Sequence, residues 1–455
     1  MSITSCRFCL RSPNFLRAAL WSAFVGLTWI CNSAVVRADW EQFQGNAAHT
    51  GYVDSYIYAP GLTQQWFSPA PSYSAGPGDR SVAIVAGDVY ATMLQGYGPV
   101  GPYLVKRLDG LTGATEWQAS IPGSSHSGVS APSVAGDTVY VHHFGHSGSS
   151  GSAFPTDYPA LVGLDRASGV QQFWTTHSGQ WSSGSRPTIE GTGVFAAGGY
   201  FGGLDAYGLN GSHVWFHGVN QQYGWIPAAD QNNVYVYMGA ASASPGPSVG
   251  SLFIVNRTTG VRDATVPHPQ SNGTFYGEEQ SVILGGQGDA LALTYNNHPA
   301  FANSKTLVSF DIVSRTINWQ ITGNFGGNAA VSDGQIAVPD GNALRIVDQS
   351  TGGTLWTWTA PGAVWGNVVL SNQYAFVNAG GSVHAIDLLT RTSVWNSSGV
   401  TGSIALDDNL LVISNPSGVR AYTAIPEPAS FVATVVAGAA WMLMRRRKAR
   451  ITGQT

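Results

Sequence analysis

A pattern that recurs about every 40 to 55 residues is the strongest constraint on how this chain can fold. Each copy has a short apolar patch, then a tight turn such as Gly-Asp, then a segment with the alternation typical of a strand. There are eight copies: SVAIVAGDVYAT from Ser81, APSVAGDTVYVHHF from Ala131, RPTIEGTGVFAAG from Arg186, PAADQNNVYVYMG from Pro227, SVILGGQGDALALTY from Ser281, AAVSDGQIAVPDG from Ala329, VVLSNQYAFVNAG from Val368 and ALDDNLLVISNPSG from Ala405.

A second motif follows seven of these copies with a fixed register. Its central turn residues are Gly113, Gly169, Gly211, Gly260, Arg315, Gly352 and Arg391. Four positions earlier stand Asp109, Asp165, Tyr207, Asn256, Asp311, Asp348 and Asp387, and four positions later stand Trp117, Phe173, Trp215, Ala264, Trp319, Trp356 and Trp395. An Asp or Asn side chain accepts hydrogen bonds from amides two or three residues on, and glycine provides the positive φ that closes such a turn. The motif therefore predicts a hairpin whose final aromatic residue packs against a neighbouring unit.

A unit of four short strands cannot bury both faces alone, so the units must pack side by side. Radial closure leaves no long open edge, and the sequence predicts an all-β, eight-bladed β-propeller of four-stranded antiparallel blades. Eight first motifs and seven second motifs leave one blade short of an outer strand. The segment GLTQQWFSP, which contains Trp66, is predicted to supply it by pairing with the last copy, so that the N-terminal strand closes the ring.

The N-terminus is typical of a secretory signal peptide. Arg7, Arg11 and Arg17 precede an apolar segment from Ala18 to Ile30, and Val36-Arg37-Ala38 is a small-residue cleavage pattern. We expect residues 1–38 to be removed; the alternative is an N-terminal membrane anchor. Cys6, Cys9 and Cys31 all lie in this segment, so the mature chain would have no disulfide.

The body of the chain is acidic. Of 21 Lys and Arg residues nine lie in residues 1–38 and 425–455, and of 25 Asp and Glu residues only one does. Residues 39–424 therefore have 12 basic and 24 acidic groups, a net charge of about −12. Such a surface repels nucleic acid and anionic lipid, so neither is expected as a partner.

The C-terminus has three parts, in the order Pro426-Glu427-Pro428, an apolar run from Ala429 to Met444, and a basic cluster that begins with Arg445, Arg446 and Arg447. This order resembles the PEP-CTERM sorting signal of Gram-negative bacteria, and we assign residues 425–450 to it. The resemblance implies that an exosortase-type enzyme cuts near the motif, and that the apolar run is a transmembrane helix held only transiently in the inner membrane. The alternative is a permanent anchor with the body facing the periplasm.

The repeats also resemble a known family. The pattern Asp-x-x-Thr-Gly-x-x-x-Trp, and the opening DWEQFQGNAAHTGY from Asp39 to Tyr52, are similar to the quinoprotein-like eight-bladed propellers. The resemblance covers residues 39–424. It implies the PQQ-like propeller fold, and the family contains both dehydrogenases and the propeller of bacterial outer-membrane protein assembly.

The enzymes of that family hold pyrroloquinoline quinone (PQQ) over a calcium ion on the propeller axis. They have a catalytic Asp in an insertion, calcium-binding Glu and Asn, a stacking Trp and often a pair of neighbouring cysteines. This sequence has no matching Asp, no such cysteine pair and no long insertions. We therefore expect no catalytic activity and no catalytic residue, and PQQ is not expected as a cofactor.

The segments before each first motif are predicted to lie at the mouth of the central channel. Aromatic, amide and charged side chains there suit a sugar or a peptide loop. Alternatively, the tryptophans pack between blades and the polar groups bind loop backbone. The candidate ligand-binding residues are His126, Trp181, Arg186, Trp225, Glu278, Asn328, Trp365 and Asn367.

No metal site is expected. His142 and His143 continue a strand and so point to opposite faces, which leaves at most two of His142, His143 and His146 to converge. Glu278 and Glu279 are adjacent in the same way and make a poor acid and base pair. The sequence has no P-loop.

Together these features predict an exported, non-catalytic propeller that acts as a binding or scaffold module at the cell surface or in the extracellular matrix. A polysaccharide or a surface protein is the expected partner, as the sorting tail implies. The alternatives are a PQQ-dependent dehydrogenase and a scaffold similar to an outer-membrane assembly factor.

Overall fold

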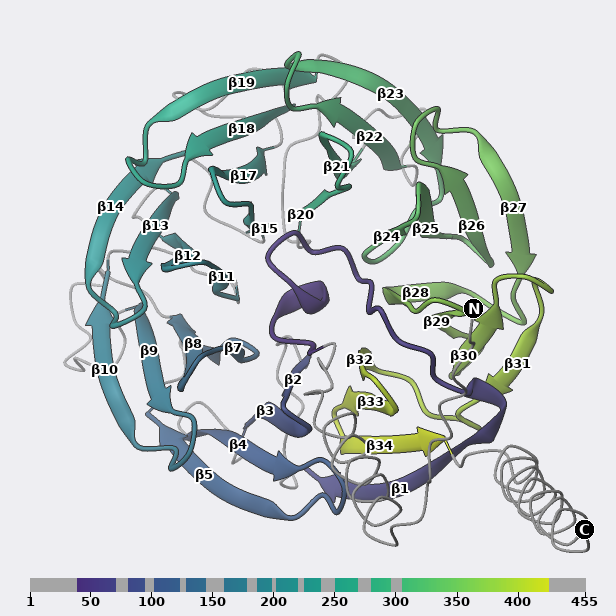
Figure 1. Ribbon diagram of the computed structural model, residues 1–455, viewed down its shortest axis with the longest axis horizontal. Helices are drawn as coiled ribbons and strands as arrows, with labels where there is room; N and C mark the ends of the chain where they lie inside the picture. Colours follow the sequence, from purple (N-terminus) through teal and green to yellow (C-terminus); the bar gives the residue numbers. More distant parts are fainter. Residues whose placement is uncertain are drawn as a thin grey trace, which may run out of the picture. The chain divides into compact units, whose positions relative to one another are not determined.

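The computed structural model describes residues 39–70, 81–94, 102–122, 128–144, 159–177, 186–198, 202–219, 225–238, 250–268, 280–295 and 305–424. Eight antiparallel sheets follow one another around a ring, and we call each sheet a blade (Figure 1). Within blades 1 to 7 the chain starts at the inner strand and moves outward through hydrogen-bonded neighbours. The fold class predicted from the repeats is therefore confirmed.

Blades 1 to 4 are built from consecutive segments of the chain. Their strands are, for blade 1, β2 (Val82–Val85), β3 (Asp88–Leu94), β4 (Tyr103–Asp109) and β5 (Thr115–Ile121); for blade 2, β6 (Gly128–Val129), β7 (Ser133–Ala135), β8 (Thr138–Phe144), β9 (Ala160–Asp165) and β10 (Gln171–Thr176); for blade 3, β11 (Thr188–Glu190), β12 (Gly193–Gly198), β13 (Gly203–Gly208) and β14 (His213–Gly218); for blade 4, β16 (Ala228–Ala229), β17 (Asn233–Met238), β18 (Gly250–Asn256) and β19 (Arg262–His268).

Blades 5 to 7 repeat this order, and β15 (Trp225–Ile226) adds a short parallel pairing to the inner strand of blade 5. Their strands are, for blade 5, β20 (Gln280–Leu284), β21 (Asp289–Tyr295), β22 (Lys305–Asp311) and β23 (Thr316–Gly323); for blade 6, β24 (Ala330–Ser332), β25 (Gln335–Asp340), β26 (Ala343–Asp348) and β27 (Thr354–Thr359); for blade 7, β28 (Val364–Leu370), β29 (Tyr374–Ala379), β30 (Ser382–Asp387) and β31 (Ser393–Asn396).

Blade 8 combines the two ends of the described chain. Its inner strands are β32 (Ser403–Asp407), β33 (Leu410–Asn415) and β34 (Gly418–Ala424), and its outer strand is β1 (Leu62–Pro69). β1 pairs antiparallel with β34, from Leu62 opposite Ala424 to Pro69 opposite Gly418. The pairing predicted for GLTQQWFSP is thus observed.

The hairpin turns have the predicted chemistry. Asp348 Oδ1 accepts the Thr351 amide at 2.8 Å, and Asn256 Oδ1 accepts the amides of Thr258 and Thr259 at 3.1 and 3.0 Å. Every turn residue of the motif has positive φ, including the two arginines: Gly113 71°, Gly169 72°, Gly211 79°, Gly260 69°, Arg315 62°, Gly352 72° and Arg391 60°.

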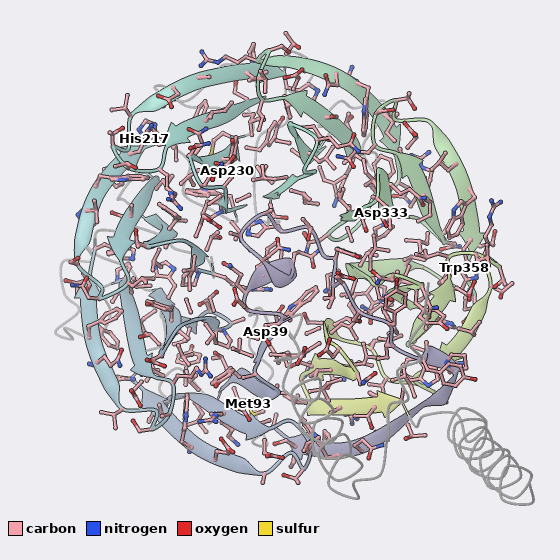
Figure 2. All side chains as sticks on the ribbon, viewed as in Figure 1. Asp39, Met93, His217, Asp230, Asp333 and Trp358 are labelled. Atoms are coloured by element: carbon pink, nitrogen blue, oxygen red, sulfur yellow. The ribbon has the colours of Figure 1, made fainter. Side chains whose placement is uncertain are left out.

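The hydrophobic core lies between neighbouring blades, and Figure 2 shows side chains filling these spaces around the ring. Tryptophans of the second motif reach from one blade onto the next, as predicted. The Trp117 indole donates a hydrogen bond to Arg166 O at 2.8 Å, and Trp319 donates to Gln349 O at 2.8 Å.

Helix is confined, in the ranges described, to two short 3-10 turns, η1 (Phe43–Gly45) and η2 (Ala59–Gly61). No helix in these ranges is long and apolar enough to cross a bilayer. The predicted signal peptide, the apolar run Ala429 to Met444 and the sorting residues Pro426, Glu427, Pro428, Arg445, Arg446 and Arg447 lie outside the described residues.

Candidate functional site: the propeller axis and its surroundings

The chain crosses the middle of the ring before it reaches β1 (Figure 1, purple). We call residues Asp39 to Tyr52 the opening segment. Its backbone bonds to the inner strands of six blades: Trp40 exchanges two hydrogen bonds with Ile84, and the carbonyls of Glu41, Ala47, Ala48, Thr50 and Gly51 accept the amides of Val134, Ala229, Leu284, Val331 and Leu370. The segment therefore occupies the centre of the ring and is hydrogen-bonded to most of its blades.

Side chains of the opening segment complete this contact. Gln42 Nε2 donates to Ile189 O at 3.0 Å, and the Ile189 amide donates to Gln42 Oε1 at 2.7 Å, which adds blade 3. Gln44 Nε2 donates to Ala329 O at 2.9 Å. Gln42 and Gln44 are both buried. Gln42 therefore acts as a structural group, because its donor and acceptor are both used, whereas the buried Gln44 Oε1 accepts no hydrogen bond within the described residues.

His49 is fully buried on the same path. Its Nδ1 lies 3.0 Å from Val282 O and its Nε2 lies 3.3 Å from Thr188 Oγ1, so the ring joins blades 5 and 3. Burial, assisted by the positive charge of Arg186, lowers the pKa of His49 to about 3. The imidazole is neutral at physiological pH, and both its nitrogens are engaged.

The buried polar side chains that the opening segment places on the axis are Gln42, Gln44 and His49, and none of them carries a negative charge. A calcium ion is held by several oxygen ligands, usually with carboxylates among them. These residues do not fit a calcium-bound PQQ, because they are neutral and supply no carboxylate, although the buried Gln44 Oε1 has no hydrogen-bond partner within the described residues.

Two of the predicted channel-mouth residues are buried. The Arg186 guanidinium lies over the Phe43 ring, with Cζ 4.4 Å from the ring centroid, and Arg186 is 3% exposed. Trp225 is 1% exposed and belongs to a core cluster with Ala47 and Phe195. In the described structure both residues contact the chain's own core.

Three other predicted residues lie together where blades 6 and 7 meet. Asn328 and Asn367 form a parallel bridge, and Asn367 bonds through its side-chain amide to both backbone groups of Ile404, at 2.8 and 3.0 Å. Trp365 is 46% exposed. The structure thus brings these three together, with the Asn367 side chain used between blades and the Trp365 indole accessible. His126, Trp181 and Glu278 lie outside the described residues.

The prediction that His142 and His143 point apart is confirmed. His142 stacks on His177 of the same blade, with ring centroids 4.9 Å apart and Nε2 atoms 2.8 Å apart, whereas His143 lies 5.0 Å from the Trp174 ring. Beyond His177 lies Asp205 of blade 3, whose Oδ2 is 3.9 Å from His177 Nδ1. His146 lies outside the described residues.

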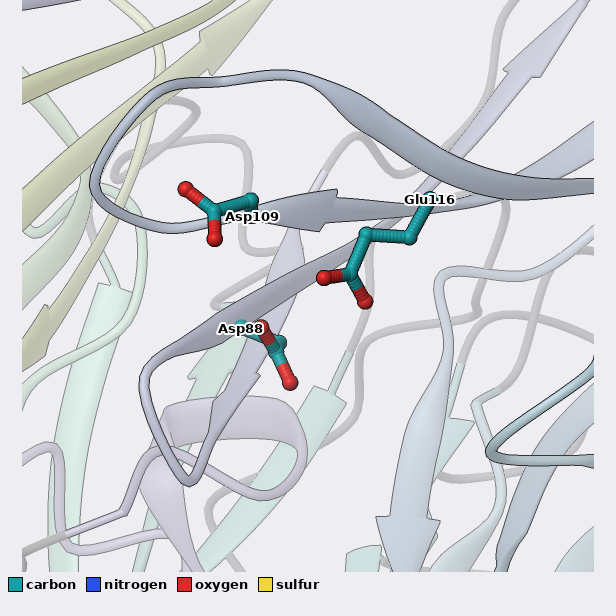
Figure 3. A group of neighbouring side chains, drawn as sticks. All are labelled: Asp88, Asp109 and Glu116. Atoms are coloured by element: carbon teal, nitrogen blue, oxygen red, sulfur yellow. The ribbon is translucent and has the colours of Figure 1, made fainter.

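Three carboxylates of blade 1, Asp88, Asp109 and Glu116, form a close group (Figure 3). Arg107 explains it: its guanidinium bonds Asp88 at 2.8 Å and Glu116 at 2.7 Å. Partial burial acts to lower the pKa of Arg107, but the hydrogen bond that it donates to Asp88 and the neighbouring charges raise it overall. Asp109 meanwhile accepts the amides of its own turn. Two of the carboxylates therefore form ion pairs with Arg107, and the third caps a hairpin turn. A metal ion at this place would have to compete with the arginine.

A groove that sequence reasoning missed lies between blades 6 and 7. Its volume is about 630 Å³, and it is lined by side chains that include Asp333, Gln335, Trp356, Gln373, Asp387 and Arg391. The only sequence signal for it is Arg391, which stands where most hairpin motifs have glycine.

Comparison with known proteins supports the fold. Residues 303–427 match the family described as outer membrane protein assembly factor BamB. No characterised protein sequence matches the chain. Among solved structures, a europium-containing methanol dehydrogenase is similar with a TM-score of 0.58 and 13% identity, covering 81% of this chain and 86% of that one.

Two further structures are similar to the same extent. BamB from Moraxella catarrhalis has a TM-score of 0.55 and 15% identity over 80% of this chain and 99% of its own. The computationally designed Ika8 protein has a TM-score of 0.57 and 13% identity over 79% of this chain and 100% of its own. A dehydrogenase, an assembly factor and a designed protein share this architecture, so the likeness shows a propeller fold and leaves activity open.

Proposed function

We propose that this chain is a non-catalytic propeller that acts as an exported binding or scaffold module. The observation that carries the proposal is the course of the opening segment. Its carbonyls accept amides from the inner strands of blades 2, 4, 5, 6 and 7, and its buried side chains are the neutral groups Gln42, Gln44 and His49. A cofactor on the axis would have to displace these bonds and leave buried strand amides unpaired, at a cost of about 1–3 kcal/mol for each one.

A calorimetric titration of the purified full chain with PQQ and calcium tests this proposal. We expect no saturable heat, no change in cofactor absorbance, and no reduction of an artificial electron acceptor when alcohols or aldose sugars are added. Binding of one PQQ per chain at micromolar affinity or better, followed by substrate-dependent dye reduction, would identify a dehydrogenase and overturn the proposal.

Delivery to the cell surface or the extracellular matrix is part of the proposal and rests on the two ends of the sequence. Residues 1–38 would direct export, and an exosortase-type enzyme would cut near Pro426-Glu427-Pro428. Cell fractionation with an antibody against the propeller tests this. Glu427→Ala should leave the body in the inner-membrane fraction, and equal surface delivery of both forms would contradict it.

The match of residues 303–427 to the assembly-factor family favours a second candidate, a scaffold that acts in outer-membrane protein assembly. Such a scaffold would bind another protein of that machinery. Affinity purification of the full chain from cross-linked cells of its own host separates the two candidates. Recovery of outer-membrane assembly proteins supports this second candidate, and recovery of polysaccharide or surface proteins supports the first.

A further inference from the structure

The tryptophans of the second motif, together with Trp66 of β1, show how one blade normally rests on the next. Five of these indoles donate a hydrogen bond to a backbone carbonyl of the following blade: Trp66 to Gly110, Trp117 to Arg166, Trp215 to Arg257, Trp319 to Gln349 and Trp395 to Leu62, at 2.8 to 3.0 Å. Four of them also lie flat against a turn glycine. A Cβ atom on Gly113, Gly169, Gly260 or Gly352 would stand 2.6 to 2.8 Å from the facing indole.

Trp356 is the exception. The turn that faces it has Arg391 in place of glycine, and the Arg391 guanidinium lies over the indole with Cζ 5.7 Å from the ring centroid. The indole N–H of Trp356 donates to no residue in the part of the chain that the structure describes. The groove of about 630 Å³ is at this junction, with Trp356 and Arg391 both in its wall.

Two polar side chains of the wall are held in place by hydrogen bonds. Asp387 is fixed at one carboxylate oxygen by the amides of Leu389 and Thr390, at 3.0 and 2.6 Å. The Asn372 side chain donates to Asp54 and accepts from the Tyr52 hydroxyl. A site whose polar groups are oriented before a ligand arrives loses little entropy when it binds.

Other side chains of the groove are available to a ligand. Asp333 (labelled in Figure 2), Gln335, Gln373 and Arg391 are solvent-exposed and line the same space. The groove therefore offers carboxylate acceptors, a guanidinium donor and amides that do both, beside the half-buried indole of Trp356.

We propose that this groove binds an uncharged saccharide segment. A sugar presents apolar C–H faces that pack on aromatic rings, and hydroxyls that both donate and accept, which matches the mixture in the wall. The carboxylates of Asp333 and Asp387, and the net charge of about −12 for residues 39–424, disfavour an anionic ligand. An apolar ligand would strip water from those groups without replacing its hydrogen bonds.

A peptide partner is less well matched. Peptide recognition relies on a central apolar or aromatic side chain that enters a fully desolvated pocket. Leu355 and Leu389 of this groove are 48% and 90% exposed and form a rim. The other apolar lining residues include Ala337, Ile346 and Leu370, which are at most 3% exposed and so offer such a side chain little apolar surface. The saccharide site rests on the proposed function as a binding module and specifies its ligand class.

A matched pair of arginine variants tests the site. Arg391→Gly removes the side chain that separates Trp356 from the turn, allows the indole to lie on the turn as Trp319 lies on Gly352, and so closes the groove. Arg315→Gly makes the same change at φ 62° in blade 5, where the facing residue of the motif is Ala264 and no indole is involved. Because glycine favours positive φ, both variants should fold at least as well as the parent.

The probe is an array of neutral oligosaccharides that includes cellohexaose, maltohexaose, laminarihexaose and mannohexaose, applied to the purified full chain with calorimetry on any that bind. We expect at least one to bind, Arg391→Gly to weaken it by more than about tenfold, and Arg315→Gly to change it by less than about twofold. Gln373→Ala, at an exposed position, should also weaken it. Failure of every sugar, binding of an extended peptide array instead, or equal affinity of parent and Arg391→Gly would overturn the proposal.

These outcomes are independent of the cofactor titration. A chain that binds both PQQ and the oligosaccharide would refute the non-catalytic function and leave the groove standing. A chain that binds neither would refute the groove alone.

Discussion

The Arg391 guanidinium lies over the Trp356 indole, 5.7 Å from Cζ to the ring centroid, at the junction where blade 6 meets blade 7. At the preceding junction, Trp319 occupies the corresponding place against Gly352 and donates its N–H to Gln349. One turn residue thus separates two kinds of junction: a closed one, in which the indole joins the blades, and an open one, in which it lines a groove.

The two kinds of junction should differ in stability. Trp66 is 7% exposed and donates to Gly110 O, so Trp66→Ala should lower the free energy of unfolding by about 3–5 kcal/mol. Trp356 is half-buried and makes no such bond, so Trp356→Ala should cost about 1–2 kcal/mol. Guanidinium unfolding followed by circular dichroism measures both variants, and equal losses would contradict the distinction.

The turn glycines should be required for two reasons: they let the facing indole approach the turn closely, and they adopt positive φ. Gly352→Ala places a Cβ 2.8 Å from the Trp319 ring at φ 72°, and should cost about 2–4 kcal/mol. Gly381 provides the matched control, because it has φ 85° and no atom within 4 Å of its added Cβ. Gly381→Ala should therefore cost only the backbone penalty of about 1–2 kcal/mol. Thermal unfolding of both variants tests this. If Gly381→Ala lowers the stability as much as Gly352→Ala does, contact with the indole is not the cause.

His49 should make the axis sensitive to acid. Burial lowers its pKa to about 3, whereas the unfolded chain takes up the proton near 6.5. Between these values the unfolded state binds more protons, so stability rises with pH and falls as the solution is acidified. From about pH 6.5 to about pH 4.5, this residue alone should remove about 2 kcal/mol.

The comparison for that prediction is His49→Asn, since asparagine tolerates the positive φ of 58° at this position and does not titrate. The variant starts less stable near neutral pH, and its unfolding free energy should fall less steeply over the same range. Other buried histidines, such as His268, contribute equally to both proteins and cancel in the difference. Parallel pH profiles would show that His49 is not buried as described.

Much of the architecture follows from local rules that a sequence displays. The spacing from Asp348 through Gly352 to Trp356 predicts a hairpin, because a carboxylate cap, a positive φ and a returning aromatic residue each require a particular side chain. The same reasoning identifies Trp66 as part of an outer strand. These elements are predictable because each depends on residues within a few positions of one another.

The site is less predictable, because it depends on contacts between residues far apart in the chain. Gln42 meets Ile189 across 147 positions, and Gln44 meets Ala329 across 285, so no spacing indicates that the opening segment lies on the axis. The sequence predicts Trp225 at the channel mouth, but a residue before an inner strand can turn its side chain either way, and this one is in the core. Arg391 departs visibly from the glycine of most motifs. That this change leaves a groove cannot be read from the sequence, because it depends on where Trp356 lies in space.

Hydrogen exchange measures most directly whether the axis is closed by the chain itself. The amides of Val134, Ala229, Leu284, Val331 and Leu370 donate to the opening segment at 2.7 to 2.9 Å. Mass spectrometry on peptides covering these strands and residues 39–52 should show slow exchange that matches global unfolding, unchanged by PQQ and calcium. Fast exchange at these amides, or protection that appears only with PQQ and calcium, would mean that the axis opens to a cofactor and would contradict the account.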